Sequence, residues 1–243
     1  MNHAGYFRLL KFYSDAWARR HCRVILSGEE NIAGSRERPR IYIISHPVTW
    51  DLPMLAHIAQ NNFYVIADKG PFAHPLVNWL FHNAGFLKLE GDNADDVIKR
   101  AGVIVEAKRP VIISLYGYGT DFGEKVRPRT GGIRIAHATK ADIYPLHLMI
   151  EEGKLIMKSF RRRRGEHYPF SVFHETLYFM TFCPPMRFED WAQDGMTYED
   201  YTKVAYSVEE KFHALEKTIT ADIGTGRYED APRRGGATRQ VIF

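Results

Sequence analysis

Five short apolar runs, each separated from the next by a segment of helical length, constrain the fold of this chain more than any other feature. The first run is IYIIS (Ile41 to Ser45), and the others begin at Phe63, Gly85, Val111 and Ile143. Runs of four to eight apolar, often β-branched residues are typical of buried strands, and parallel strands need long crossovers. The pattern predicts an α/β fold, a single domain with a mostly parallel central sheet flanked by helices.

The rest of the chain completes this outline. The segments between the runs predict helices over 52–58, around Trp79, from a cap at Asp92 to Ala107, and over 133–138. A turn through residues 151–153 predicts that KLIMKSF returns beside the fifth run, which gives the sheet a partly antiparallel edge. Residues 197–222 predict a long C-terminal closing helix.

The first 22 residues predict an amphipathic helix. Phe7, Leu10, Tyr13 and Trp17 fall on one stripe, and basic residues occupy much of the remaining surface. Two interpretations are open: a helix packed on the domain, or a basic, aromatic helix in a membrane interface, whose deletion leaves the core folded. The expected organisation is this helix over 1–22, a main domain over 23–223 and a flexible tail over 224–243.

The composition of the chain limits the cellular compartments and the classes of partner that we expect. The chain is 45% hydrophobic and 26% charged, so it can bury a core. Its two cysteines, Cys22 and Cys183, exclude a disulfide framework, and no metal-ligand spacing is present. No apolar run reaches the roughly 18 residues of a spanning helix. We expect a cytoplasmic protein, peripheral on the inner face of the membrane if the N-terminal helix binds there. The net charge of +4 favours anionic partners, but no nucleic-acid motif accompanies it.

The segment SHPVTWD holds the strongest catalytic candidates, His46 and Asp51. His46 directly follows the first predicted strand, and open α/β sheets bind ligands at the carboxyl ends of their strands. A carboxylate beside an imidazole fixes its tautomer and stabilises the charged form, as a general base requires. A second pair with the same spacing, His137 and Asp142, falls at the opposite edge of the sheet, so we expect it to be structural.

Six phrases, in order, resemble the glycerolipid (lysophosphatidate-type) acyltransferase family with its H-x-x-x-x-D motif, over about residues 25 to 150. They are SGEENI, SHPVTWD, KGPFAHPLVNW, GFLKLEG, YGYGTD and IYPL.

The resemblance implies direct transfer of a fatty acyl group from acyl-CoA or acyl-carrier protein to a hydroxyl or amine, with no bound cofactor or metal. His46 is then the general base and Asp51 orients it. Candidates for the oxyanion and acyl donor are Lys69, Gly119 and Thr120, although the glycines of this loop also suit a simple tight turn. Candidates for binding the acceptor are Lys88, Tyr118, Lys125, Arg127 and Arg129.

Two phrases depart from the family pattern at residues associated with an acceptor phosphate. Gly91 and Asp121 stand where arginines are expected, and Tyr118 stands in place of a glutamate. We therefore expect a neutral or amine acceptor. The alternatives are a lysophosphatidate acyltransferase proper, in which the basic loop replaces the missing arginines, and a non-catalytic lipid or acyl-carrier binding protein of the same fold. The basic run Arg161 to Arg164 fits a solvated turn or a docking site for an anionic partner.

Overall fold

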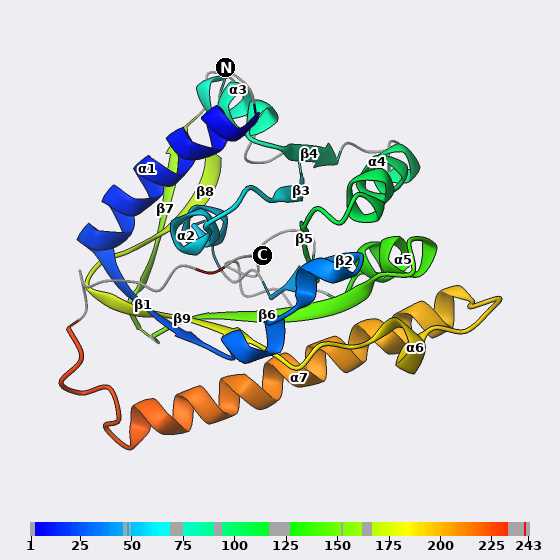
Figure 1. Ribbon diagram of the computed structural model, residues 1–243. Helices are drawn as coiled ribbons and strands as arrows, with labels where there is room; N and C mark the ends of the chain where they lie inside the picture. The colour runs from blue at the N-terminus through cyan, green and yellow to red at the C-terminus, as the bar shows by residue number, and fades with distance from the viewer. Residues whose placement is uncertain are drawn as a thin grey trace.

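The computed structural model describes residues 3–45, 48, 50–68, 75–89, 94–116, 127–151, 153–161, 167–232 and 241. A seven-stranded sheet with the strand order β1-β9-β6-β2-β5-β3-β4 forms its centre (Figure 1). These strands are β1 (Cys22–Ser27), β2 (Arg40–Ile44), β3 (Tyr64–Asp68), β4 (Phe86–Leu89), β5 (Val111–Ser114), β6 (Asp142–Ile150) and β9 (Thr176–Phe182). The five strands predicted from the sequence are all present and mutually parallel, which confirms the predicted fold class.

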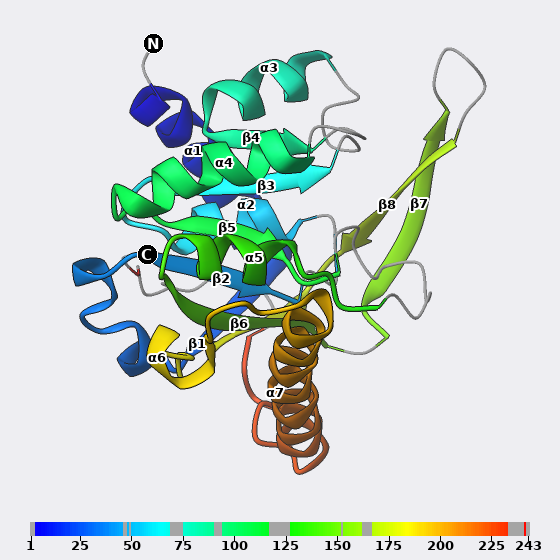
Figure 2. The ribbon, with the colours of Figure 1, turned by 90° about the vertical axis from the view of Figure 1, so that its right-hand side faces the viewer.

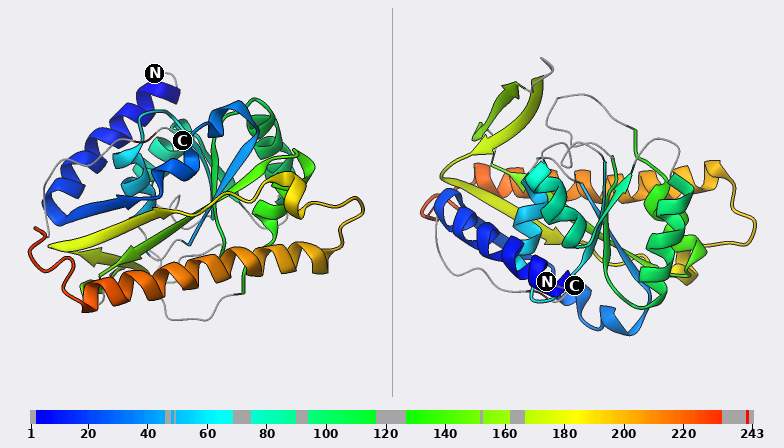
Figure 3. Two further views of the ribbon diagram at one scale, coloured as in Figure 1. Left: turned by 60° about the horizontal axis from the view of Figure 1, so that its bottom comes forward. Right: turned by 90° about the horizontal axis from the view of Figure 1, so that it is seen from above.

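Helices cover both faces of the sheet, as the view from above shows (Figure 3). One face carries α1 (His3–His21), α2 (Asp51–Ile58) and α3 (Pro75–Asn83), and the other carries α4 (Ala94–Glu106), α5 (Gly131–Ala138) and α7 (Tyr198–Gly224). Shorter elements are η1 (Glu29–Ile32), η2 (Ser35–Glu37) and α6 (Phe188–Trp191). The closing helix α7 begins after Thr197, whose hydroxyl accepts a hydrogen bond from the Asp200 N–H in a capping box.

The antiparallel part of the sheet comes from a strand that the sequence analysis did not predict. KLIMKSF forms β7 (Leu155–Arg161), which leaves the sheet and pairs with β8 (His167–Phe173) in a projecting hairpin (Figure 2). The strand that runs antiparallel to β6 is β9. Nearly every β9 residue is buried, as a strand between two neighbours and two helical layers requires, whereas Ile156 in β7 is 55% exposed.

Helix α1 packs on the domain, and its buried stripe differs in two residues from the predicted one, since Ser14 and Ala18 are buried where Tyr13 and Trp17 were expected. Phe7 and Leu10 are buried, but Tyr13 is 60% exposed. The Lys11 ammonium donates to the carbonyl oxygens at the end of α2, including that of His57 at 2.6 Å. Deleting residues 1–20 would uncover core side chains and remove this contact, so we now expect the deletion to destabilise the core.

The expected loose tail is anchored at one described position. Val241 is buried, its N–H donates to the Ile58 carbonyl at 2.8 Å, and its own carbonyl accepts from the Gln60 N–H at 2.8 Å. These hydrogen bonds place Val241 beside the end of α2. The C-terminal segment is thus attached to the domain at Val241, although it lies 17 residues beyond the end of α7.

Candidate active site at the carboxyl ends of the parallel strands

The candidate site begins where β2 ends, in the middle of the sheet. Ser45 follows β2, and its hydroxyl accepts from the Leu148 N–H at 2.8 Å and donates to the Leu148 carbonyl at 3.1 Å. These bonds join the end of β2 to β6 at the point where the chain turns toward α2. His46 is the next residue, and it lies outside the described residues.

Asp51 is the first residue of α2, and its carboxylate is held in a fixed position. The side chain is fully buried. Its Oδ2 accepts a hydrogen bond from the Val48 N–H at 3.0 Å, and its Oδ1 accepts one from the hydroxyl of Tyr178. The free N–H groups of a helix N-terminus also favour a negative charge there. Burial of a carboxylate is costly unless such donors compensate it, so this environment is built to keep Asp51 in place.

Tyr178 is the residue of this site that the sequence analysis missed. It lies in β9, is fully buried, and is 127 positions from Asp51 in the chain. The only sequence signal was a hydroxyl-bearing side chain within the apolar run TLYFMTF. A buried tyrosine hydroxyl normally has a hydrogen-bond partner, but the sequence does not say which one.

Three of the candidates for binding the acyl acceptor are among the described residues, and they lie at different distances from β2. Arg129 lies closest to the end of β2. Its backbone N–H donates to the Leu115 carbonyl at 2.6 Å, and the Leu115 N–H donates to the Ile44 carbonyl, at the end of β2, at 2.9 Å. Arg127 is exposed two residues earlier. Lys88 lies in β4, three strand spacings from β2, which is about 14 Å.

The other candidates fall outside the described residues. They are Lys69, Gly119 and Thr120 for the oxyanion and donor, and Tyr118 and Lys125 for the acceptor. Gly91, Asp121 and Arg162 to Arg164 lie outside them as well.

The start of the glycine-containing loop is attached to α7. The Tyr116 hydroxyl donates to Glu209 Oε1 at 3.0 Å, directly after β5. Burial, followed by this hydrogen bond and the Glu209 charge, raises the pKa of Tyr116, so its hydroxyl stays protonated and remains a donor. The closing helix therefore helps to position the segment that leads into Tyr118, Gly119 and Thr120.

The second histidine–aspartate pair does not form a dyad. The His137 ring nitrogens contact the Gln193 carbonyl at 3.0 Å and the Tyr201 hydroxyl at 3.1 Å. Asp142, at the amino end of β6, accepts from Arg187 at 2.7 Å and from the Phe188 N–H at 2.9 Å. Each side chain thus has its own structural partners, at the edge of the sheet opposite to Asp51.

Neither thiol in the chain is suited to nucleophilic chemistry. Cys22 and Cys183 are free and buried, and burial raises the pKa of each thiol to about 12. Within the ranges that the structure describes, no group of three or more His, Cys, Asp or Glu side chains is placed to hold a metal ion. No helix in those ranges has the length and apolar character needed to cross a membrane.

Comparison with known proteins places this site in context. The sequence model of a family described as "Acyltransferase" matches residues 23–149, just over half of the chain and all the strands from β1 to β6. Among solved structures, the 1-acyl-sn-glycerophosphate (LPA) acyltransferase PlsC from Thermotoga maritima is similar, with a TM-score of 0.60, 17% sequence identity, and coverage of 86% of this chain and 79% of that chain. At this identity the likeness shows a shared fold. A search of curated proteins gave no match.

Proposed function

Because this chain belongs to the acyltransferase family, we propose that it moves a fatty acyl group from acyl-CoA or acyl-carrier protein to a hydroxyl or amine acceptor, with His46 as general base. The observation that supports this assignment is the placement of Asp51. Its buried carboxylate lies five residues after the strand-end histidine and is held by donors from two elements. Catalysis needs such a partner for the imidazole, whereas binding alone does not.

The proposed reaction is a single displacement through a tetrahedral intermediate. His46 takes the proton from the acceptor as its oxygen or nitrogen attacks the thioester carbonyl carbon. The carbon–sulfur bond then breaks, and the departing thiolate takes the proton from the imidazolium. Asp51 stabilises the imidazolium while that proton is held. The N–H groups of Gly119 and Thr120, with Lys69 as the weaker candidate, are proposed to bind the oxyanion.

We propose a neutral or amine-bearing acceptor, because Gly91 and Asp121 replace two arginines that a phosphate would use. The alternative, lysophosphatidate acyltransferase proper, has one observation in its favour: the backbone of Arg129 is fixed at the end of β5, beside the end of β2. A competition assay with one acyl thioester decides between them. If lysophosphatidate is acylated faster than neutral and amine acceptors by a wide margin, the acceptor proposal is wrong and the loop arginines bind the phosphate.

We also propose that α1 attaches the protein to the surface of an anionic membrane. Phe12 and Tyr13 are 67% and 60% exposed on the outer face of the helix, and their ring centroids are 5.8 Å apart. Arg8, Arg19 and Arg20 are exposed around them. Aromatic side chains bordered by cations are typical of helices that lie in a membrane interface.

The central proposal is tested by the release of free thiol from a long-chain acyl-CoA and from acyl-carrier protein, each with a panel of acceptors. The wild type should release thiol only when an acceptor is present. His46→Ala should reduce the rate by roughly a hundredfold to ten-thousandfold, as loss of a general base does. Asp51→Asn should have a smaller but still large effect. If the wild type releases no thiol with any acceptor, a non-catalytic binding protein is favoured. A fully active His46→Ala would refute the mechanism.

A further inference from the structure

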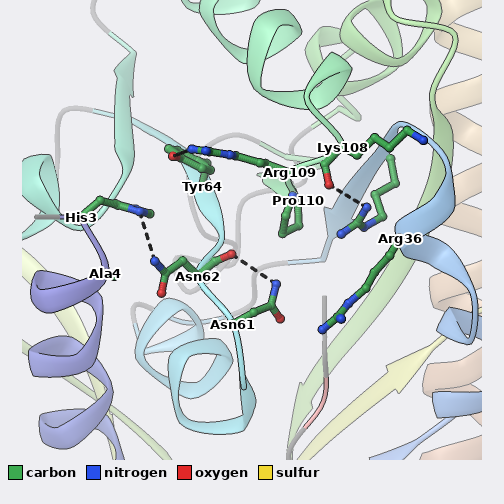
Figure 4. Close-up of a pocket in the computed structure, with 10 residues that line it drawn as sticks. His3, Ala4, Arg36, Asn61, Asn62, Tyr64, Lys108, Arg109 and Pro110 are labelled. Carbon is green, nitrogen blue, oxygen red and sulfur yellow. Dashed lines mark hydrogen bonds between the residues drawn. The ribbon is translucent and has the colours of Figure 1, made fainter.

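A cavity of about 550 Å³ opens at the edge of the sheet opposite to the candidate active site. It lies where β2, β3 and β5 begin, and its lining includes Arg40 at the start of β2. Tyr64 at the start of β3 and Pro110 just before β5 also line it (Figure 4). The five residues of β2 alone span about 15 Å, so a ligand here is separated from Asp51 by the length of the sheet. The proposed acyl transfer does not use this cavity.

Positive charge is concentrated in the cavity. Three guanidinium groups line it, those of Arg36, Arg40 and Arg109, and its lining residues include no carboxylate. Arg40 is only 2% exposed, and it donates to the carbonyl of Lys108 at 2.9 Å. Burial lowers the pKa of Arg40; contacts with Tyr42 and Tyr144 partly oppose this effect, and the nearby charge of Arg36 adds a smaller lowering. A cationic side chain buried beside a second one gains stability when an anion binds between them.

The wall across from Arg36 is already ordered by its own contacts. The His3 ring stacks on Tyr64 with a centroid distance of 4.7 Å, and Arg109 donates to the Tyr64 hydroxyl at 2.9 Å. His3 Nε2 lies 2.8 Å from the Ala84 carbonyl. Its Nδ1 lies 3.4 Å from the side-chain amide nitrogen of Asn62 (Figure 4). One ring nitrogen donates and the other accepts in this arrangement, which fits the neutral imidazole. Burial lowers the pKa of His3; the hydrogen bond to the Ala84 carbonyl partly opposes this effect, and the Arg109 charge adds a smaller lowering.

The floor between these walls supplies neutral polar groups. The side-chain amide of Asn61 donates a hydrogen bond to the backbone carbonyl of Asn62 at 3.4 Å (Figure 4). Arg36 extends toward Asn61 from the opposite wall (Figure 4). The first turn of α1 reaches the cavity at Ala4, and helix N-termini favour anions.

We propose that this cavity binds the phosphate group of a small phosphomonoester, a second ligand distinct from the acyl donor and acceptor. Planar guanidinium groups match phosphate oxygens in pairs, and three of them line one concave surface here. Pockets of 300–1,000 Å³ are typical of sites for small organic ligands, so the volume admits a molecule of mononucleotide size. The asparagine amides and the His3–Tyr64 stack then contact the part of the ligand beyond the phosphate.

The test is calorimetric titration of the full chain with AMP, inorganic phosphate and adenosine. AMP and phosphate should each bind at one site per chain, with an affinity that falls as salt is added. Adenosine should not bind measurably, because it lacks the phosphate. The variant R36Q/R109Q should bind AMP at least tenfold more weakly than the wild type, because it lacks two of the arginines that contact the phosphate. Both side chains are exposed, so this variant should fold normally.

The matched control is K99Q/R100Q, which removes the same charge from exposed positions in α4 that do not line the cavity. It should bind AMP within twofold of the wild type. A tighter affinity for AMP than for phosphate supports contacts beyond the phosphate, and equal affinities support recognition of the phosphate alone. The proposal is overturned if neither ligand binds at about 10 mM, if adenosine binds as well as AMP, or if R36Q/R109Q and the control behave alike. Thiol release by R36Q/R109Q should equal that of the wild type, so this test is independent of the proposed acyl transfer.

Discussion

Replacing Tyr178 with phenylalanine removes one hydroxyl group, which contacts the Asp51 carboxylate of the proposed catalytic dyad. The hydroxyl donates to Asp51 Oδ1, and both side chains are fully buried. Phenylalanine keeps the ring and its contact with Phe173, whose centroid is 5.9 Å away. The substitution therefore isolates the hydrogen bond from the packing around it. We regard Tyr178 as a positioning residue.

The size of the effect follows from the charge of the Asp51 carboxylate, which accepts the hydrogen bond. A hydrogen bond to a charged group contributes about 1.5–3 kcal/mol, and water cannot replace this donor in the fully buried site. We expect the free energy of unfolding to fall by about 2 kcal/mol. The Asp51 carboxylate keeps the Val48 N–H as a donor but gains rotational freedom. We expect kcat to fall by about tenfold to thirtyfold, which corresponds to about 1.4–2 kcal/mol of activation free energy, while KM for the acyl donor changes little.

The assay combines urea unfolding with steady-state thiol release, and Tyr144→Phe is the matched control. Tyr144 is 1% exposed in the same sheet, and its hydroxyl accepts from Arg187 at 3.2 Å, near the amino end of β6. Its loss should reduce stability by up to about 1 kcal/mol, because Arg187 is partly solvated, and should leave kcat unchanged.

A double-mutant cycle gives the outcome that would refute this reasoning. If Tyr178 acts through the carboxylate, Tyr178→Phe should have little further effect on kcat in the Asp51→Asn background, because the two changes disrupt one unit. An equal loss in both backgrounds would show that Tyr178 acts by another route. Wild-type kcat in Tyr178→Phe alone would show that the bond has no role in positioning Asp51.

Three further predictions follow from other described residues. His137→Ala should leave thiol release within twofold of the wild type, because the ring contacts only structural partners; a hundredfold loss would make this histidine, and not the strand-end one, the base. His147 is buried, and burial is the main cause that lowers its pKa to about 4. The free energy of unfolding should therefore be highest above pH 6.5 and should fall as the pH drops toward 4, by about 3 kcal/mol more than in His147→Leu. The same pH dependence of unfolding in the two proteins would contradict this prediction. Phe12→Ser with Tyr13→Ser should reduce co-sedimentation with anionic vesicles without loss of fold, whereas Tyr198→Ser, at a 73% exposed position in α7, should not; equal binding by both variants would remove α1 from the membrane proposal.

The parts of the site that the sequence predicted depend on the pattern of apolar and polar residues within single segments of the chain. Ile41 to Ile44 are apolar at every position, which is the pattern of a strand buried on both faces, and the first titratable residue after this strand is His46. Parallel strands end at one edge of the sheet, so the position of Asp51 at this edge followed from the same pattern. The closing helix was predicted for a similar reason, since its apolar period continues without a break after the Thr197 cap.

The wrong and missing parts depend on pairing between distant segments. KLIMKSF and TLYFMTF are both plausible partners for β6 by propensity, and the short turn at 151–153 favoured the first. In the folded protein β9 takes that place, because its apolar residues are buried on both faces between β1 and β6, whereas Lys158 in β7 is exposed. Burial of apolar area outweighs the proximity of β7 in the chain.

By itself the sequence determined the class of fold, the strand that precedes His46, and the helix that carries Asp51 at the carboxyl ends of the parallel strands, because apolar periodicity and strand-end position are properties of neighbouring residues. Only the tertiary structure decided the strand order, the hydroxyl of Tyr178 that holds Asp51 from 127 positions away, and the cavity that gathers arginines from the ends of separate strands. These features form when segments far apart in the chain pack together, and the free energy of that packing is set by the whole core.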